Sequence, residues 1–498
     1  MTDWGSWSDY RALENPTVIL PKGGDMPCAL FYPADYSIGM ANLGFHYIYR
    51  ALREQGVAVE RFFASPIRYR SVEKDTLLER FPLILGSVSY EADVPLFAKW
   101  LAEGGINPSR KARGPSNRSP VIGAGGAVTY INPLMLSGIC DFIVLGDGVA
   151  QARYLVETAR RGLPREKALA ALAENRSIFV PSIHEAGRHL LDISKGDISG
   201  DYGRGTWTTP RAAFGNTLLL ELQRGCARGC RFCTLPSCFG PARVRGVSLV
   251  KRDMMESGLE GGFAQIGLVT PEAGDYKDLD ELLEFAERHG KGVSFASLRA
   301  DGITERMMRA VLRAGRHSLT IAPETGDDGL RERCGKRFTN SRVIEALKMA
   351  SQIGAKNAKL YFMTGLPGET DENIVSISRL CASARNETGL RITAAVSPFV
   401  PKPRTPWAGE EFAGEEKLKR AHSLLSKTLR GVAGVKLQVA SIKEACMEYA
   451  ISWAGAPASD FIAEAALNGN PYRALKGMVD KREVGSEFAR LGLGGFPQ

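Results

Sequence analysis

Residues 217–233 read TLLLELQRGCARGCRFC and join an apolar run to three cysteines spaced C-x3-C-x2-C. The run of leucines predicts a buried strand, and the glycines after it predict a loop at the strand's carboxyl end. Parallel α/β folds place their ligand sites at this end of their strands. The stretch therefore predicts a ligand site that presents three thiols on one loop.

Five more apolar segments follow, and amphipathic segments that predict helices lie between them. The six expected strands are 217–225, 263–271, 292–300, 317–326, 357–367 and 391–401. This alternation indicates a parallel sheet, and six such units fit a partial (β/α)6 barrel of the TIM type. We expect the barrel to occupy residues 201–405.

The first third of the chain also alternates apolar strands with amphipathic segments, and several of its strands end in glycine. Near-continuous apolar strands predict a Rossmann-like parallel sheet covered on both faces, so the fold class is α/β. We expect this domain and a linker rich in Gly, Asp and Thr over residues 1–200. Residues 406–498 predict a mostly helical, basic C-terminal extension.

The chain has 498 residues, which is enough for two or three domains. Its formal charge of +9 is spread over a long chain and gives little support for a nucleic-acid partner, which stays open. No stretch approaches the roughly 18–20 apolar residues of a membrane span. The polar N-terminus resembles neither a secretory signal nor a transit peptide, so we expect a cytoplasmic protein.

Four of the nine cysteines fall between positions 226 and 238, and the odd total argues against a disulfide framework. A 4Fe–4S cluster held by Cys226, Cys230 and Cys233 leaves one iron without a protein ligand, which is the open position that a catalytic metal needs. The alternative is a structural zinc site that adds Cys238. Zinc sites usually combine two paired CxxC knuckles, and the sequence has no second pair.

Residues from about 217 to 405 resemble the radical S-adenosylmethionine (SAM) superfamily. The resemblance implies that SAM binds the open iron through its amino and carboxylate groups and is cleaved reductively to methionine and a 5′-deoxyadenosyl radical. It also implies an electron donor such as flavodoxin or ferredoxin. The cofactor supplies this chemistry, and the protein supplies position and exclusion of water.

The resemblance further implies which strand ends contact SAM. Polar residues after the second, third and fourth strands would receive its ammonium, carboxylate and ribose, and an aromatic residue and the fifth strand's turn would back its adenine. The residues in these places are Thr270 and Glu272, Ser297 and Arg299, Glu324, Phe232, Gly365 and Leu366. Two plainer interpretations stay open: Glu272 caps the following helix, and Arg299 forms an ion pair with Glu324.

The N-terminal domain resembles the cobalamin-binding-like domains fused to many radical SAM enzymes. The Asp-x-His-x-x-Gly pattern of such domains is not kept, because Ser37 follows Asp35 in the place of histidine and Gly39 comes one position early. Cobalamin without a protein ligand to cobalt would rest on Ser87, Ser89 and residues 123–126. The alternative is a vestigial domain. The order of segments resembles a largely uncharacterised bacterial subfamily, which supplies no substrate.

The leading hypothesis is radical SAM catalysis on an unidentified substrate, with methyl transfer as the reaction if cobalamin binds. One alternative is tRNA or protein modification like that of the methylthiotransferases. Those enzymes carry a second cluster on three N-terminal cysteines, whereas only Cys28 and Cys140 precede the motif here. The other alternative is a non-catalytic, metal-stabilised RNA-binding module, which would leave the polar residues at the strand ends unexplained.

Overall fold

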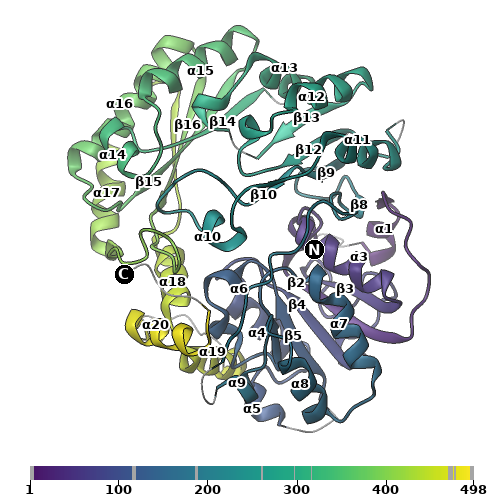
Figure 1. The fold of residues 1–498 in the computed structure, drawn as a ribbon. Coiled ribbons are helices and arrows are strands. Elements are labelled where there is room, and N and C mark those ends of the chain that lie inside the picture. The colour runs from purple at the N-terminus through teal and green to yellow at the C-terminus, as the bar shows by residue number, and fades with distance from the viewer. Residues whose placement is uncertain are drawn as a thin grey trace. The chain divides into compact units, whose positions relative to one another are not determined.

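The computed structural model describes residues 5–114, 119–185, 189–259, 262–296, 298–315, 317–468, 475 and 478–493. The chain divides into two compact units (Figure 1). The first takes in residues up to 217 and nearly all residues from 450 onward, and the second takes in residues 218–449. The chain therefore leaves the first unit, builds the second and returns. The domain boundaries expected near residues 200 and 405 stay predictions.

The first unit is built on a six-stranded sheet in the order β3-β2-β4-β5-β6-β7. All neighbours are parallel except β7, which is antiparallel to β6. The strand order reverses between β2 and β4, which is the switch point where such sheets bind ligands. The strands are β2 (Met26–Asp35), β3 (Val57–Ser65), β4 (Leu83–Ser87), β5 (Val121–Gly125), β6 (Phe142–Val144) and β7 (Ile178–Phe179), beside a small antiparallel pair, β1 (Asn15–Pro16) and β8 (Trp207–Thr208).

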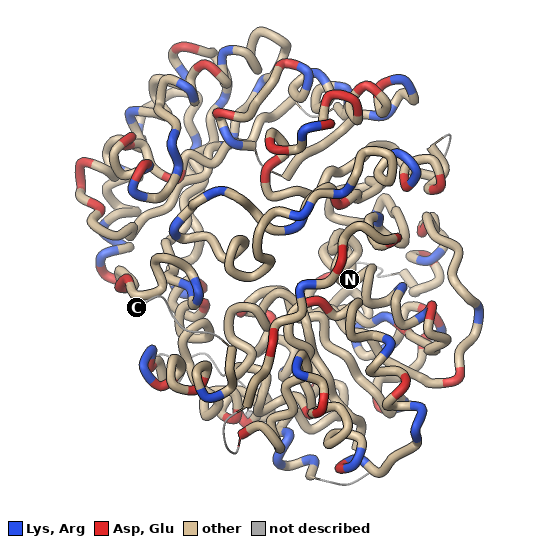
Figure 2. Tube along the Cα trace, viewed as in Figure 1, with Lys and Arg blue, Asp and Glu red and all other residues tan. Residues whose placement is uncertain are grey.

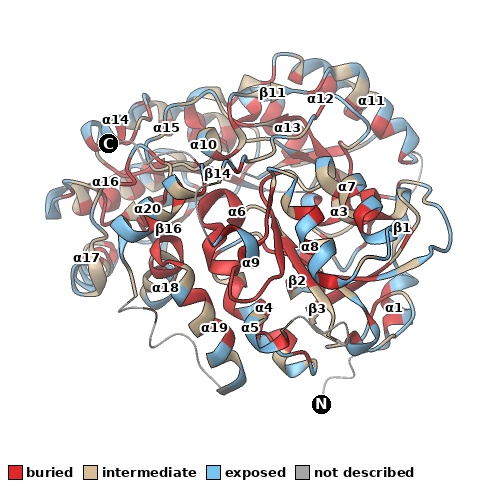
Figure 3. Cartoon of the chain, turned by 60° about the horizontal axis from the view of Figure 1, so that its bottom comes forward, coloured by how far each residue is buried: buried red, intermediate tan, exposed pale blue. Residues whose placement is uncertain are grey.

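Helices of the first unit pack on this sheet through apolar faces, and Figure 3 shows buried residues concentrated in the strands. Helix α3 begins where the side chain of Asn42 accepts a hydrogen bond from the amide of Phe45. The helices are α1 (Trp7–Arg11), α2 (Tyr36–Gly39), α3 (Leu43–Glu54), η1 (Leu78–Arg80), α4 (Asp93–Glu103), α5 (Arg110–Arg113), α6 (Val128–Ile131), η2 (Pro133–Leu136), α7 (Val149–Arg160), α8 (Arg165–Ala173), α9 (Pro181–His184), α19 (Ala456–Asn468) and α20 (Lys481–Arg490).

The C-terminal segment completes the first unit. Helix α19 packs against α4 and η2. The buried amide of Asn132 donates to the carbonyls of Ile451 and Ala454, and the hydroxyl of Ser459 donates to the carbonyl of Met135. Because these donors and acceptors are buried, each would lose a partner if the segment were absent.

The second unit contains the parallel strands expected from the sequence. They form a three-stranded sheet, β13-β12-β9, and a four-stranded sheet, β14-β15-β16-β17, and a parallel bridge between Leu298 and Ile321 joins them. The expected α/β fold with a partial barrel is confirmed. The strands are β9 (Thr217–Glu221), β12 (Gln265–Val269), β13 (Gly292–Phe295), β14 (Ser318–Glu324), β15 (Asn357–Thr364), β16 (Arg391–Pro398) and β17 (Val435–Val439).

Strand β17 lies in the segment expected to be mostly helical, so it adds a seventh strand to the six expected. It is short, lies at the edge of its sheet and has exposed residues at Lys436, Gln438 and Val439. A half-exposed edge strand of this length carries too few apolar residues to stand out in the sequence.

Helices cover the outer side of these strands (Figure 1). Their apolar faces join the strands in one large core that includes Leu218, Met254, Leu283 and Ile377. The elements are β10 (Gln223–Arg224), α10 (Leu235–Phe239), β11 (Arg243–Val244), α11 (Val247–Glu256), η3 (Ala273–Asp275), α12 (Leu279–Arg288), η4 (Ala300–Gly302), α13 (Glu305–Arg313), α14 (Asp328–Arg333), α15 (Asn340–Gln352), α16 (Asp371–Thr388), α17 (Gly414–Leu429) and α18 (Ile442–Trp453), which contains the division at 449/450.

Basic and acidic residues are interspersed along both units (Figure 2). Many of them form ion pairs within one helix, such as Arg309 with Glu305 and Lys419 with Glu415. In the described part of the chain, none of the helices has the length and apolar character needed to span a membrane.

Candidate functional site

The three cysteines of the motif lie on one loop between β10 and α10, and each is partly exposed. The loop starts at Gly225, whose φ of +79° and contact with the carbonyl of Gly240 exclude a side chain. The amide of Arg228 lies 3.4 Å from Sγ of Cys226, and the amide of Cys233 donates to the carbonyl of Cys230 at 3.2 Å. The backbone therefore folds back on itself and keeps the three cysteines on one short loop.

The three thiols are close enough to influence one another's ionisation. Burial, together with the charges of Cys230 and Cys226, raises the pKa of Cys233 to about 11. Burial also raises the pKa of Cys230, while the ammonium of Lys336 and the guanidinium of Arg299 oppose this. Cys238 differs, because it is buried on α10.

No three Cys, His, Asp or Glu side chains converge on one metal-ion position in the described ranges. In a 4Fe–4S cluster each thiolate ligates a separate iron, so its ligands need not converge on one position.

Two other loops hold the cysteine loop in place. Gly335, with φ of +83°, lies directly against the backbone of Gly229 and Cys230, so that a side chain at this position would overlap the loop. The amide of Arg231 donates to the carbonyl of Cys334 at 3.0 Å, and the amide of Trp407 donates to the carbonyl of Arg231 at 3.1 Å. These contacts fix the backbone that carries the thiols.

An ion-pair network lies at the ends of the second and third strands. Arg228, inside the cysteine motif, donates to Asp275 of η3 at 2.9 Å. Arg299 donates to both oxygens of Asp301 at 3.0 Å and lies 3.9 Å from Glu272. The acidic residues just after strands β12 and β13 therefore form ion pairs with two arginines, of which Arg228 lies in the cysteine loop.

Glu272 is a helix cap in this structure. Its Oε1 accepts a hydrogen bond from the amide of Gly274, the second residue of η3, at 3.1 Å. The hydroxyl of Thr270 donates to the carbonyl of Glu272 at 3.3 Å. Ser297 lies outside the described residues. The capping interpretation of Glu272 thus agrees with the structure, and its contact with SAM stays a prediction.

Arg299 does not pair with Glu324, as one interpretation of the sequence had it, because its partners are Asp301 and Glu272. The residue is only 9% exposed, and its Nη1 has no hydrogen-bond partner among the residues that the structure describes. A buried guanidinium donor without an acceptor indicates a place for an anionic or carbonyl group of a ligand.

Glu324 ends β14 in a left-handed conformation, with φ of +68°. The strand pairing shifts between Ile321 and Glu324, so a bulge turns this residue out of the regular strand. A non-glycine residue in this region costs about 1–3 kcal/mol and persists where its surroundings hold it. Its carboxylate pairs with the buried ammonium of Lys336 at 2.5 Å.

The turn after β15 is closed by Glu369, whose Oε2 accepts a hydrogen bond from the amide of Gly365 at 2.7 Å. Burial raises the pKa of Glu369 to about 7. Leu366, 1% exposed, belongs to a small apolar cluster with Phe399 and Trp407, and the partly buried Phe232 packs against the same cluster. The structure thus brings Phe232 and Leu366, both expected near adenine, into one apolar region.

Sequence reasoning missed Arg228, Asp275, Asp301 and Lys336. Asp275 and Asp301 follow the second and third strands at the ends where ligands bind, which is a usable signal. Lys336 carries no comparable signal, because it lies between two helices and reaches Glu324 only in the folded chain.

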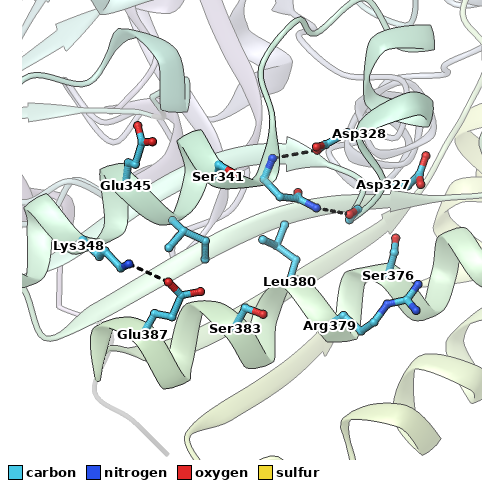
Figure 4. Close-up of a pocket in the computed structure, with 13 residues that line it drawn as sticks. Asp327, Asp328, Ser341, Glu345, Lys348, Ser376, Arg379, Leu380, Ser383 and Glu387 are labelled. Atoms are coloured by element: carbon cyan, nitrogen blue, oxygen red, sulfur yellow. Dashed lines mark hydrogen bonds and ion pairs between the residues drawn. The ribbon is translucent and has the colours of Figure 1, made fainter.

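A groove of about 670 Å³ lies elsewhere on the second unit, among α14, α15 and α16 (Figure 4). Its lining mixes acidic side chains such as Asp327 and Glu345 with the basic Arg379, and Lys348 pairs with Glu387 at 2.8 Å. None of the residues predicted to bind the cluster or SAM lines it.

Two glycines in and just after β5 of the first unit serve internal packing. Gly123 leaves room for the ring of Phe142, and Gly126, with φ of +116°, lies against the backbone of Val88. Ser89, just after β4, is hydrogen-bonded within the unit, because its hydroxyl accepts from the side-chain amide of Asn42 at 3.4 Å. The residues expected to cradle cobalamin thus contact one another and the neighbouring strands.

Comparison with known proteins matches two parts of the chain to families. Residues 220–381 match the radical SAM superfamily, and residues 44–181 match the family of N-terminal domains of radical SAM proteins. An uncharacterised protein of Methanocaldococcus jannaschii is 36% identical over 226 residues, which are 44% of this chain and 49% of that protein. A threonylcarbamoyladenosine tRNA methylthiotransferase of Treponema pallidum is 26% identical over 42% of this chain and 43% of its own length. The chain thus spans about half, or less, of these curated relatives.

The fold also resembles a solved structure. The radical S-adenosylmethionine methyltransferase TsrM from Kitasatospora setae, with cobalamin and a [4Fe-4S] cluster bound, has a TM-score of 0.51 and 13% identity, over 77% of this chain and 74% of that one. At this identity the likeness concerns the fold.

Proposed function

We propose, from the premise that this chain belongs to the radical SAM superfamily, that it holds a 4Fe–4S cluster on Cys226, Cys230 and Cys233 and cleaves SAM reductively. The observation that carries the proposal is one loop with three partly exposed thiols beside the unsatisfied Nη1 of Arg299. When bound, the cluster supplies one electron to the SAM sulfonium, and methionine and a 5′-deoxyadenosyl radical result.

The protein's own residues would bind and orient SAM. Nη1 of Arg299 donates to the SAM carboxylate, because the other donors of this side chain are engaged by Asp301. The carboxylate of Glu324 accepts from the ribose hydroxyls. Phe232 and Leu366 offer adenine an apolar surface. Thr270, Glu272 and Ser297 complete the proposed set around the amino acid part of SAM.

The proposal includes a one-electron donor such as flavodoxin or ferredoxin and a substrate whose identity the site does not define. Burial of the side chains proposed to bind SAM would keep bulk water from this part of the site and protect a reactive radical. Glu272, Glu324 and Arg299 are all buried in this unit.

The test is anaerobic reconstitution of the Cys230→Ala variant with iron, sulfide, SAM and dithionite. We expect loss of the visible absorption that bleaches on reduction, and no 5′-deoxyadenosine by mass spectrometry. The matched control is Cys446→Ala, which removes another partly exposed cysteine, on α18, and should leave both readouts unchanged. Retention of SAM cleavage in Cys230→Ala, or a colourless wild type that binds zinc, would contradict the proposal.

A second candidate is cobalamin-dependent methyl transfer. It is favoured by the strand order of the first unit, which has its switch point between β2 and β4, and by the fold likeness to TsrM. The packing of Gly123 and Gly126 weighs against it. Retention of a corrinoid spectrum after reconstitution and desalting would support this candidate, and its loss would reject it.

Methylthiotransferase-like modification is less well supported. A second three-cysteine cluster would have to use Cys28 and Cys140, which are both completely buried in the first unit, and a third cysteine that the N-terminal sequence lacks.

A further inference from the structure

The bulge that presents Glu324 is held by one lysine. Lys336 is 6% exposed, and its Nζ donates to Oε1 of Glu324 at 2.5 Å and to the carbonyl of Ala322 at 2.7 Å. These acceptors lie within the irregular end of β14, so one ammonium bridges both sides of the bulge. Its two hydrogen bonds oppose relaxation of Glu324 from the left-handed conformation.

The backbone around Lys336 is in turn fixed to the cysteine loop. Its neighbour Gly335 lies against Gly229 and Cys230 without room for a side chain. The amide of Lys336 donates to the carbonyl of Arg331 at 3.1 Å, which ties the residue to the end of α14. A displacement of the cysteine loop and a displacement of Lys336 are therefore coupled.

Lys336 also contributes positive charge to the cysteine loop. The buried ammonium of Lys336 stands next in the chain to Gly335, which lies against Gly229 and Cys230, and the amide of Arg231 donates to the carbonyl of Cys334 on the same segment, so this charge lies close to the cysteine loop. Three thiolates and a reduced cluster gather negative charge in this region, and a buried cation offsets part of it because the local dielectric is low.

We propose that Lys336 is a positioning residue with two linked effects: it holds the carboxylate of Glu324 for the SAM ribose, and it raises the reduction potential of a cluster on Cys226, Cys230 and Cys233. The inference rests on the proposed function. Nothing in the sequence around Lys336 distinguishes it from the exposed Arg337 beside it. The structure does so through burial and through two short hydrogen bonds.

The experiment compares the reconstituted wild type with Lys336→Met, Lys336→Arg and Arg337→Met. The midpoint potential is measured by electron paramagnetic resonance during reductive titration, and SAM affinity is measured by equilibrium dialysis. We expect Lys336→Met to shift the midpoint potential to more negative values and to weaken SAM binding about 10-fold or more, the range that loss of a charged hydrogen bond gives. Lys336→Arg keeps the charge and should keep the potential close to that of the wild type.

Arg337→Met is the matched control, because it removes the same charge from the adjacent, exposed position. It should change neither readout. A second variant, Glu324→Gln, covers the case in which Lys336→Met does not fold. It removes a negative charge from the same ion pair and should shift the potential in the opposite direction, to less negative values, while also weakening SAM binding.

The outcomes separate the two proposals. A wild type that assembles no 4Fe–4S cluster overturns the proposed function itself. A wild type that holds the cluster and binds SAM, together with a Lys336→Met variant of unchanged potential and affinity, overturns only the role of Lys336. A shift of Glu324→Gln in the same direction as Lys336→Met also overturns it, because a change of charge cannot produce both.

Discussion

The ends of the parallel strands in the two units look alike in sequence and differ in use. In the first unit, Gly126 at the end of β5 lies against the backbone of Val88, and Gly123 within the strand leaves room for the ring of Phe142, so these glycines serve internal packing. In the second unit, Arg299 keeps a buried donor without a partner among the described residues, and Glu324 is held in a strained conformation. Glycine at a strand end therefore indicates a ligand site only where a polar side chain nearby lacks a hydrogen-bond partner or has a strained backbone.

The largest difference between the two units is expected when one methyl group is added in each. Gly225→Ala places a side chain against the carbonyl of Gly240 at the start of the cysteine loop, and we expect complete loss of bound iron after reconstitution. Gly126→Ala overlaps the backbone of Val88 and should lower the free energy of unfolding by about 1–3 kcal/mol while iron content stays that of the wild type.

Iron and sulfide analysis with thermal unfolding measures both variants. Loss of iron in Gly126→Ala together with normal iron content in Gly225→Ala would contradict the assignment of the ligand site to the second unit.

A smaller effect is expected from Arg299→Met, which removes the unsatisfied donor. The affinity for SAM should fall about 10- to 100-fold, because a hydrogen bond to a charged group contributes about 1.5–3 kcal/mol. The matched control is Arg309→Met on α13, since Arg309 is exposed and pairs with Glu305. Isothermal titration under anaerobic conditions gives both affinities, and equal values for Arg299→Met and wild type would mean that Nη1 does not face SAM.

The smallest effect on cluster and SAM binding is expected at Glu369, where the pH dependence of stability should change instead. Burial raises the pKa of Glu369 from 4.5 to about 7. The folded state therefore binds this proton more tightly than the unfolded state does, so its stabilising contribution is complete below pH 4.5 and is lost as the pH rises towards 7. Glu369→Gln should remove this part of the pH dependence, up to about 3 kcal/mol, because each pKa unit corresponds to about 1.4 kcal/mol.

Urea unfolding between pH 4.5 and 8 measures the difference between wild type and Glu369→Gln. An unfolding free energy of the wild type that rises over this interval relative to the variant has the wrong sign for a raised pKa.

The sequence predicted the first six parallel strands of the second unit because their apolar residues are nearly continuous, and it predicted the cysteine loop from the spacing of three thiols. It did not single out β3 or β7 of the first unit. It did not reveal β17, in which only Val435, Leu437 and Val439 are apolar. It also did not reveal Lys336 or the pairing of Arg228 with Asp275, because these contacts join loops that are far apart along the chain. Local patterns define elements, whereas ion pairs between loops depend on the completed fold.

The return of the chain to the first unit has a consequence for biosynthesis. The second unit is an insertion into the first. Helix α4 ends at Glu103 and α19, which packs on it, begins at Ala456, so α19 leaves the ribosome about 350 residues after α4. At the usual rate of about 5–20 residues per second, this delay is roughly 20–70 s. During that time the buried amide of Asn132 lacks the carbonyls of Ile451 and Ala454. The first unit can therefore complete its fold only after the second unit has been translated.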